Sequence, residues 1–383
     1  MRVPSPIKVL FVHPNNKLTG QEFSLLERMI GLRRIGGTEC ALLLPEEGDF
    51  SALVKKEDFS VRHIPMPRLK KLNPVPYLKT VFAVKKLIQT DGIHVVHCSG
   101  IYPNQFCLPA ARMSDVPVIG QVTTTVYNDY DISSNFVSKI DLLITCSLAA
   151  KKHLEGIPEL ATGLKPENIH CVYDGISENT HKFTDEQIAV LRAEFGIAED
   201  DQVVGQLSEV IPRKGCEYFV EMAREVKQAL PKTKFLIIGK SHRDEYEENL
   251  RRSIAEHGLE KDVLLTGFRK DFYAFLQLMD VSVLASLAEG LGRVIVESQY
   301  MEKPMVATAV SGNVEAIEDG KSGFLVPPED PSALADKVIR LLKDEELRRK
   351  LGASGYLSAK NKFSIDGHAA ALREIYVTLL KSL

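Results

Sequence analysis

The sequence lacks the features that would assign it to a membrane-spanning, zinc-binding or disulfide-rich class. No apolar run approaches the ~18 residues of a membrane-spanning helix, and Met1 to Pro6 lack the apolar stretch of a secretory signal. The six cysteines form no CxxC pair, which argues against a zinc site or a disulfide framework and favours a reducing compartment. The formal net charge of −3 is not the net positive charge that is typical of nucleic-acid-binding proteins. We therefore expect a cytoplasmic protein with no nucleic-acid partner.

Two common nucleotide-binding motifs are also missing. The segments 239–241 and 320–322 read Gly-Lys-Ser and resemble the end of a P-loop, but Lys234 and Glu315 replace its first glycine. No G-x-G-x-x-G motif follows the first expected strand, which weakens the case for a dinucleotide oxidoreductase. The sequence therefore lacks the usual motifs of a P-loop nucleotide-binding protein and of a dinucleotide oxidoreductase.

The sequence offers only one weak candidate for a metal site. Asp129 and Asp131 have the spacing of a carboxylate pair that could hold a divalent cation. A single pair of this kind is a common chance match in a polar loop. We therefore predict that no metal is bound.

Acidic residues are absent between Asp58 and Asp91. The basic residues in this interval are Arg62, Arg68, Lys70, Lys71, Lys79, Lys85 and Lys86. Apolar residues recur at helical spacing within 77–88, and basic amphipathic segments favour anionic surfaces. Residues 62–86 are thus either a solvated helix and loop or a peripheral contact with an anionic acceptor or the inner face of a membrane.

Short β-rich runs alternate with amphipathic helical stretches along the whole chain. The expected strands are 7–12, 40–44, 95–97, 117–121, 142–145 and 169–172, then 203–207, 235–238, 263–265, 281–284, 305–308 and 323–326. The expected helices include 22–34, 103–113, 215–228, 244–257, 292–301 and 331–343. Short apolar runs separated by helices indicate parallel strands that are buried on both faces.

This alternation stops and starts again, which predicts two doubly wound, Rossmann-like α/β domains facing a cleft. Strand signals cease and polar residues accumulate over 174–184. We therefore predict an N-terminal domain over 1–180, a C-terminal domain over 181–364 and a last helix within 365–383 that crosses back over one of them. Ligands of such sheets bind beyond the carboxyl ends of the strands, so each domain would contribute loops to a divided site.

The strongest candidate site lies in the segment Glu289 to Glu297. A strand leads into a loop made of Gly290, Leu291 and Gly292, and a helix starts there with Arg293. Glycines let backbone N–H groups approach an anion, and a helix N-terminus carries a partial positive charge, so the loop suits a diphosphate. Glu289 and Glu297 lie about two helical turns apart and offer carboxylates to sugar or ribose hydroxyls.

Two weaker candidates follow other expected strands. Arg213 and Lys214 come after the strand 203–207, where they can neutralise the charge of a departing diphosphate. Gly20 opens the helix after the first strand and would let a ligand approach the backbone from the first domain.

Because of these residues and their order, the chain resembles the retaining glycosyltransferases of family 4, which have the GT-B architecture. Glu289 and Glu297 match the E-x7-E signature of that family. The flanking landmarks occur in the family order: Gly205-Gln206-Leu207, Lys214-Gly215, Ile238-Gly239, Thr266-Gly267-Phe268, Lys303-Pro304, Ser311-Gly312-Asn313 and Asp319-Gly320. The resemblance is dense over about 203–345 and looser before that.

The resemblance implies a role for each matched residue. Glu289 would contact the transferred hexose-type sugar and Glu297 the ribose, while Lys214 and the backbone of 290–292 would hold the diphosphate of a UDP- or GDP-linked donor. Gly239 falls in the family order, and the base would lie near the backbone at Phe268. The resemblance also implies retention of anomeric configuration, no required cofactor or metal, and a sugar or lipid-linked acceptor on the first domain.

Two positions depart from the family pattern. Gln206 stands where the family usually has an arginine that contacts the diphosphate, and Arg213 or Arg293 is the candidate replacement. Thr123 or Thr124 stands where many members have a histidine that organises the sugar site. Besides a glycosyltransferase for cell-surface glycans or glycolipids, the alternatives are a nucleotide-sugar epimerase and a non-catalytic nucleotide-sugar-binding protein, and these departures support the last.

Overall fold

The computed structural model describes residues 3–67, 74–123, 136–157, 163–178, 182–241 and 243–382. The chain forms two compact units, one made of residues 1–177 with 363–383 and the other of residues 178–362. The division between them falls within the predicted joint at 174–184. The candidate residues Thr124, Asp129 and Asp131, and the part of the basic stretch at 68–73, lie outside the described residues.

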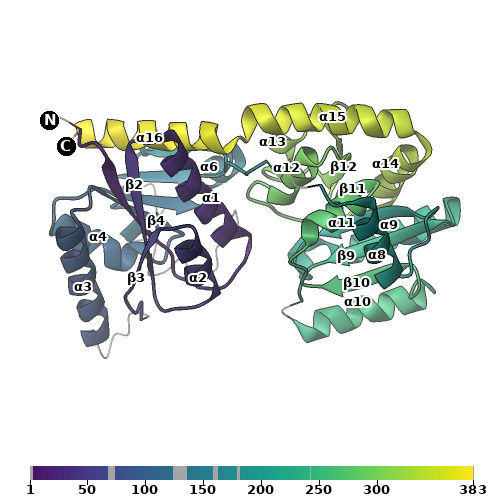
Figure 1. Cartoon of the computed structure of the whole chain (residues 1–383), viewed down its shortest axis with the longest axis horizontal. Coiled ribbons are helices and arrows are strands. Elements are labelled where there is room, and N and C mark those ends of the chain that lie inside the picture. Colours follow the sequence, from purple (N-terminus) through teal and green to yellow (C-terminus); the bar gives the residue numbers. More distant parts are fainter. Residues whose placement is uncertain are drawn as a thin grey trace. The chain divides into compact units, whose positions relative to one another are not determined.

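The described part of the first unit contains a seven-stranded parallel sheet in the order β3-β2-β1-β4-β5-β6-β7 (Figure 1). Its strands are β1 (Ile7–Val12), β2 (Thr38–Leu44), β3 (Ser60–His63), β4 (Val95–Ser99), β5 (Val118–Val122), β6 (Leu142–Thr145) and β7 (Ile169–Cys171). Its helices are α1 (Gly20–Ile35), α2 (Asp49–Lys56), α3 (Val75–Asp91), α4 (Asn104–Arg112), α6 (Leu148–Glu155), a 3-10 turn (Pro166–Asn168) and α16 (Ile365–Lys381).

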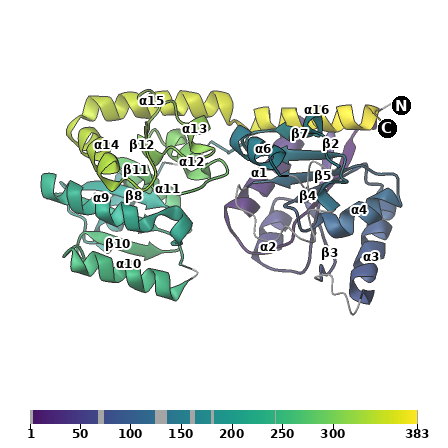
Figure 2. The same cartoon turned by 180° about the vertical axis from the view of Figure 1, so that it is seen from behind.

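The alternation along β1 shows why this sheet is covered on both faces. Leu10 and Val12 belong to a core with α3 and α4, which lie side by side in Figures 1 and 2. Val9 and Phe11 belong to a second core with α1, α2 and α16. Successive side chains of a strand point to opposite faces, so an uninterrupted apolar run requires helices on both sides.

The second unit repeats this plan with a six-stranded parallel sheet in the order β10-β9-β8-β11-β12-β13, among its described residues. Its strands are β8 (Gln202–Leu207), β9 (Thr233–Ile238), β10 (Val263–Gly267), β11 (Val281–Leu284), β12 (Met305–Thr308) and β13 (Phe324–Val326). Its helices are α8 (Asp185–Glu194), a 3-10 turn (Pro212–Lys214), α9 (Cys216–Ala229), α10 (Asp244–Glu256), α11 (Phe272–Leu278), α12 (Arg293–Tyr300), α13 (Asn313–Ala316), α14 (Pro331–Lys343) and α15 (Glu345–Lys362).

The prediction of two doubly wound α/β domains is confirmed, and every strand expected from the sequence is present. Strand β3 was not predicted, because it is an edge strand whose side chains are all at least partly exposed. Helix α15 was not predicted either, because its sequence is mostly polar and contains two glycines. One of them, Gly352, is needed for packing: a Cβ there would lie 2.0 Å from the Glu302 carbonyl oxygen.

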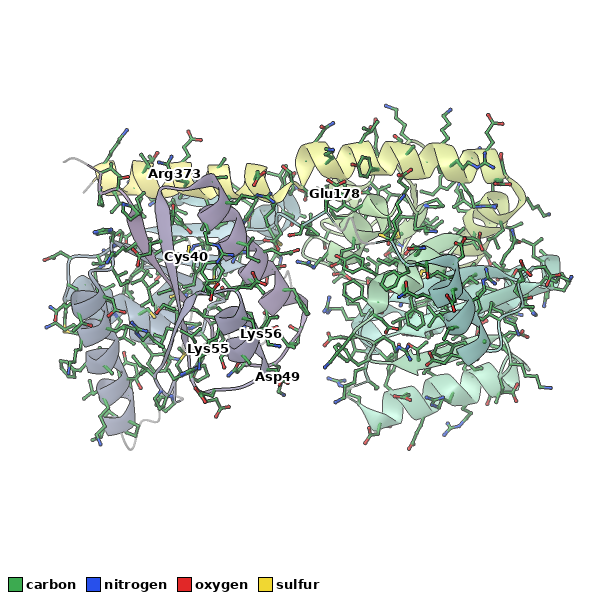
Figure 3. All side chains as sticks on the ribbon, viewed as in Figure 1. Cys40, Asp49, Lys55, Lys56, Glu178 and Arg373 are labelled. Carbon is green, nitrogen blue, oxygen red and sulfur yellow. The ribbon has the colours of Figure 1, made fainter. Side chains whose placement is uncertain are left out.

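The last helix, α16, belongs to the first unit and packs along α1 (Figure 1). Gly31 makes this close contact available, since a Cβ there would lie 2.9 Å from the Ile365 side chain. Arg373, labelled in Figure 3, lies over Gly37 just before β2. The preceding helix α15 stays in the second unit, where Tyr356 donates a hydrogen bond of 2.6 Å to Glu178, also labelled in Figure 3.

A buried polar cluster ties α16 and α1 to the segment that leaves the first unit. Arg28 is 2% exposed and donates to Asp174 at 3.1 Å and to Nε2 of His368 at 3.2 Å. The other ring nitrogen of His368 contacts the Tyr173 carbonyl at 2.6 Å. Burial, and then the charge of Arg28, lower the pKa of His368 to about 4, so the imidazole is neutral and accepts from the guanidinium.

The six cysteines are free thiols, and five of them are buried. Burial raises the pKa of Cys40 to about 12, which removes it from thiolate chemistry at neutral pH. Within the described ranges, no group of three or more His, Cys, Asp or Glu side chains is placed to hold a metal. None of the described helices is long and apolar enough to cross a membrane.

Candidate functional site

The candidate residues of the second unit gather where the strand order of its sheet reverses. Strands β8 and β11 are neighbours in the middle of the sheet, although they are not consecutive in the chain. The crevice beyond the carboxyl ends of two such strands is the usual ligand site of a doubly wound sheet. Two loops leave the sheet at this place, residues 208–215 after β8 and residues 285–292 after β11.

These two loops are hydrogen-bonded to each other. The backbone N–H of Leu287 donates to the Arg213 carbonyl at 2.8 Å. The Arg213 side chain in turn donates to the Ala288 carbonyl at 2.9 Å. Gly215 has a φ of 61°, and a Cβ there would lie 2.1 Å from the Ala285 carbonyl oxygen, so only glycine allows this approach. The backbone thus holds Arg213 and Lys214 against the loop that carries Glu289.

Glu289 is the centre of the site, with 6% of its surface exposed. Its carboxylate accepts a hydrogen bond from the ammonium group of Lys214 and another from the Ser286 hydroxyl at 2.7 Å. Arg213 brings a second cation to within 3.7 Å of the same carboxylate. The sequence predicted Glu289, Lys214 and Arg213 as parts of one site, and the structure brings them into contact.

The protonation state of Glu289 follows from this environment. Burial by itself would raise the pKa of the carboxyl. The charge and hydrogen bond of Lys214, with smaller contributions from Ser286 and Arg213, outweigh burial and lower the pKa below its usual value. Glu289 is therefore ionised at neutral pH, in an ion pair between groups that are mostly shielded from water.

The glycine loop and helix α12 follow immediately. Gly292 caps α12 with a φ of 63°, and its lack of a side chain leaves room for Asn313. The loop also passes close to Gly312, where a Cβ would lie 2.0 Å from the Gly290 carbonyl oxygen. Both glycines are therefore required by close backbone packing. The N-terminus of α12 has the partial positive charge that favours an anion.

Glu297 lies on α12 and is 6% exposed. Its carboxylate accepts a hydrogen bond of 2.7 Å from the Arg293 side chain, one helical turn away. The structure therefore pairs Arg293 with Glu297, while Arg213 is the arginine that reaches Glu289. Leu291, between the two glycines, is buried and contributes its backbone to the loop.

The remaining predicted residues lie outside these two loops and α12. Gly239 follows β9 and packs against the Ser208 carbonyl, 1.9 Å from where its Cβ would be, so it belongs to the same edge of the sheet. Phe268 follows β10 and is 53% exposed. Gly20 is the first residue of α1 in the first unit, where the preceding Thr19 bonds Glu22 in a capping box. Thr123 follows β5 in the first unit.

Sequence reasoning missed Ser286 and misjudged Gln206. Ser286 donates to Glu289, but a serine three residues before a glutamate carries no signal that distinguishes it from a turn residue. Gln206 was considered only as the loss of an arginine. In the structure it is fully buried and bonded to both loops of the site.

Comparison with known proteins finds a family match in the second unit. Residues 187–358, which lie within the second unit, match the family described as "Glycosyl transferases group 1". The chain is 29% identical to EpsD of Bacillus subtilis (strain 168), covering 64% of this chain and 63% of EpsD. It is 33% identical to the alpha-D-kanosaminyltransferase of Streptomyces kanamyceticus, covering 50% of each chain. The matches thus span about half to two thirds of these relatives.

The solved structures extend the likeness to the whole chain. HepE of Anabaena, determined in complex with UDP-glucose, superposes with a TM-score of 0.81 at 22% identity and covers 97% of this chain and 100% of its own. At that level of identity the likeness concerns the fold. Residues 187–358 of the second unit thus match the group 1 glycosyl transferase family, and the chain as a whole has the GT-B fold.

Proposed function

We propose that the protein is a retaining glycosyltransferase that moves a hexose-type sugar from a UDP- or GDP-linked donor to a sugar or lipid-linked acceptor, without a metal. The observation that carries this proposal is the buried carboxylate of Glu289 between Lys214 and Arg213, at the switch point of the domain that matches the family. The product would be part of a cell-surface glycan or glycolipid.

Sugar transfer requires cationic groups next to the leaving diphosphate. When the bond between the sugar and the diphosphate breaks, negative charge develops on the departing phosphate oxygens. Lys214, Arg213 and the N-terminus of α12 are cationic or partly cationic groups that are already positioned at one edge of the sheet. Preorganised groups of this kind stabilise developing charge without reorganising in the transition state.

The two glutamates would recognise the hydroxyl groups of the donor. A carboxylate accepts hydrogen bonds from sugar hydroxyls, with Glu289 next to the transferred sugar and Glu297 next to the ribose. HepE, with the same fold, binds UDP and UDP-glucose. This supports a uridine-linked donor as the first to test, with a guanosine-linked donor as the alternative.

The first prediction concerns the donor. We expect UDP or GDP, and the matching nucleotide sugar, to raise the melting temperature, because a ligand that binds only the folded state stabilises it. Calorimetry and thermal shift with UDP, GDP, ADP and their sugars, with and without EDTA, measure this. Binding is expected to be selective for one base, insensitive to EDTA and absent in Glu297→Ala. The matched control is Glu256→Ala, on the exposed end of α10.

The outcomes separate the alternatives. Slow hydrolysis of the donor, and transfer to an added acceptor, would support the glycosyltransferase. Conversion of the donor into its epimer without an acceptor would replace this proposal by an epimerase, and tight binding without any turnover would replace it by a binding protein. Failure of all nucleotides and nucleotide sugars to bind would overturn the proposal.

We also propose that α3 in the first unit contacts an anionic membrane surface. Its exposed side includes Val75, Leu78 and Phe82, which are 53%, 44% and 56% exposed. Lys79, Lys85 and Lys86 lie on the same helix, and its first acidic residue is Asp91, at the end. An apolar stripe among lysines is the pattern of helices that lie in the headgroup region of anionic bilayers.

The second prediction tests this contact. We expect the protein to partition onto phosphatidylcholine vesicles that contain 30 mol% phosphatidylglycerol, roughly the anionic fraction used to mimic a charged leaflet. Exchange of both Lys85 and Lys86 for serine is expected to lower partitioning about thirtyfold, since each lysine near such a surface contributes about 1 kcal/mol. Phe82→Ser removes the apolar anchor, and Val190→Ser on α8, which is 65% exposed, is the control. Equal binding to neutral vesicles, or no effect of these substitutions, would contradict the contact.

A further inference from the structure

Gln206, which stands where the family usually has an arginine, makes several hydrogen bonds of its own at the site. It is the fifth residue of β8 and is fully buried. Its side-chain N–H groups face the Lys214 carbonyl at 2.9 Å, the Ser208 hydroxyl at 3.2 Å and the Cys216 sulfur at 3.6 Å. Its side-chain oxygen accepts the backbone N–H of Ala285 at 3.1 Å.

The position of Gln206 in the sheet shows what these bonds replace. Residues of β8 and β11 pair at Val204 with Val281 and at Gly205 with Ser282, and the paired register ends there. Beyond this point β8 continues beside β9 to Leu207 and β11 continues beside β12 to Leu284, and the two loops of the site follow. The Gln206 amide spans the gap, because one end of it bonds the β8 loop at Lys214 and the other end bonds the β11 loop at Ala285.

The two bonded residues lead directly to the charged groups. The Lys214 carbonyl accepts a hydrogen bond from the Gln206 amide, and the Lys214 ammonium group bonds Glu289. Ala285 is followed by Ser286, whose hydroxyl also bonds Glu289. The primary amide of Gln206 can donate to one loop and accept from the other, whereas an arginine at this place could donate but not accept.

We propose that Gln206 is a positioning residue, which fixes Lys214 relative to Glu289 without touching the ligand. This inference rests on the proposed function, in which Lys214 holds the diphosphate of the donor. Gln206 then affects binding of the second phosphate of the nucleoside diphosphate, which UMP lacks, and does so only through Lys214.

The third prediction tests this with UDP and UMP, or with GDP and GMP if the first experiment selects guanosine. Gln206→Met keeps the length of the side chain and removes the hydrogen bonds to both loops, so UDP affinity is expected to fall about tenfold while UMP affinity stays unchanged. Because the effect passes through Lys214, adding Gln206→Met to Lys214→Ala is expected to cause no further loss of UDP affinity. Calorimetry on the four proteins of this double-mutant cycle measures the coupling.

The control is Gln202→Met, at the other end of the same strand, where the side chain bonds only the Leu342 carbonyl at 2.8 Å among the contacts of the described residues. If Gln206→Met melts below the assay temperature, Gln206→Glu carries the test, since it keeps the acceptor for Ala285 and loses the donor to Lys214. Equal losses for UDP and UMP, additive effects with Lys214→Ala, or unchanged UDP affinity would each overturn the positioning role. Absence of UDP and GDP binding in the unmodified protein would instead overturn the proposed function.

Discussion

Replacement of Glu289 by glutamine is expected to reduce sugar release from the donor about a thousandfold and, at the same time, to tighten the binding of UDP. The carboxylate of Glu289 occupies Lys214 and Arg213 when no donor is present. A diphosphate must compete with it for these two cations. Glutamine removes the competing charge, whereas the reaction loses the carboxylate that we propose faces the sugar.

The gain in affinity is expected to be about tenfold, since charges a few ångströms apart near a protein surface interact by a few kcal/mol and much of this is offset by solvent. Calorimetry with UDP measures it, and hydrolysis of UDP-glucose measures the loss of activity. Glu221→Gln is the matched control, because Glu221 also contacts two nitrogen-bearing side chains, Arg224 at 3.2 Å and His257 at 2.8 Å, but lies on α9. Weaker UDP binding in Glu289→Gln would contradict competition between the carboxylate and the diphosphate.

The parts of the site that a local pattern records were predictable from the sequence. Strand β11, the glycine loop and α12 follow one another within twenty residues, and their order of apolar run, glycines and amphipathic stretch predicts a strand, a turn and a helix. The carboxyl ends of parallel strands share one edge, so the topology alone brings the loops after β8 and β11 together. Lys214 and Glu289 could be assigned to one site in this way, although 75 residues separate them.

The contacts within the site were not predictable, because they depend on side chains whose neighbours come from other strands. Gln206 has no local feature that distinguishes it from a polar residue at a strand end, and its meaning appears only when Lys214 and Ala285 lie on either side of it. The pairing of Arg293 with Glu297 is the exception, because these residues are four apart on one helix.

The buried polar cluster of the first unit was also not predictable from the sequence. Arg28 lies in a helix with several arginines and glutamates, so its residue type predicts a solvent-exposed position. In the structure it is 2% exposed, and its partners Asp174 and His368 are 146 and 340 residues away. Only the return of α16 to α1 creates the pocket in which a guanidinium can be buried with a carboxylate.

This burial makes the first unit sensitive to the loss of Asp174. The structure shows an ion pair of 3.1 Å between Arg28 and Asp174, with side chains 2% and 11% exposed. Removing one partner of a buried pair leaves an uncompensated charge, which typically costs about 3–5 kcal/mol. Asp174→Ala is therefore expected to lower the free energy of unfolding of the first unit by that amount, as measured by urea denaturation.

The same two helices provide the matched control. Arg34 on α1 pairs with Asp366 on α16 at 2.5 Å, but both side chains are more than half exposed. Exposed pairs contribute about 0–1 kcal/mol, so Asp366→Ala is expected to leave the urea midpoint almost unchanged. Comparable losses in the two variants would mean that burial does not determine the strength of these pairs.

A double substitution separates the cost of the unpaired charge from the loss of packing. Combining Asp174→Leu with Arg28→Met replaces the buried ions by apolar side chains of similar volume, a change that is often neutral or stabilising. We expect this variant to recover most of the stability that Asp174→Ala loses, because no charge is then left in the pocket beneath α16. If the double variant is instead as unstable as Asp174→Ala, the hydrogen bonds from Arg28 to Asp174 and His368, rather than charge compensation, hold α16 to the first unit.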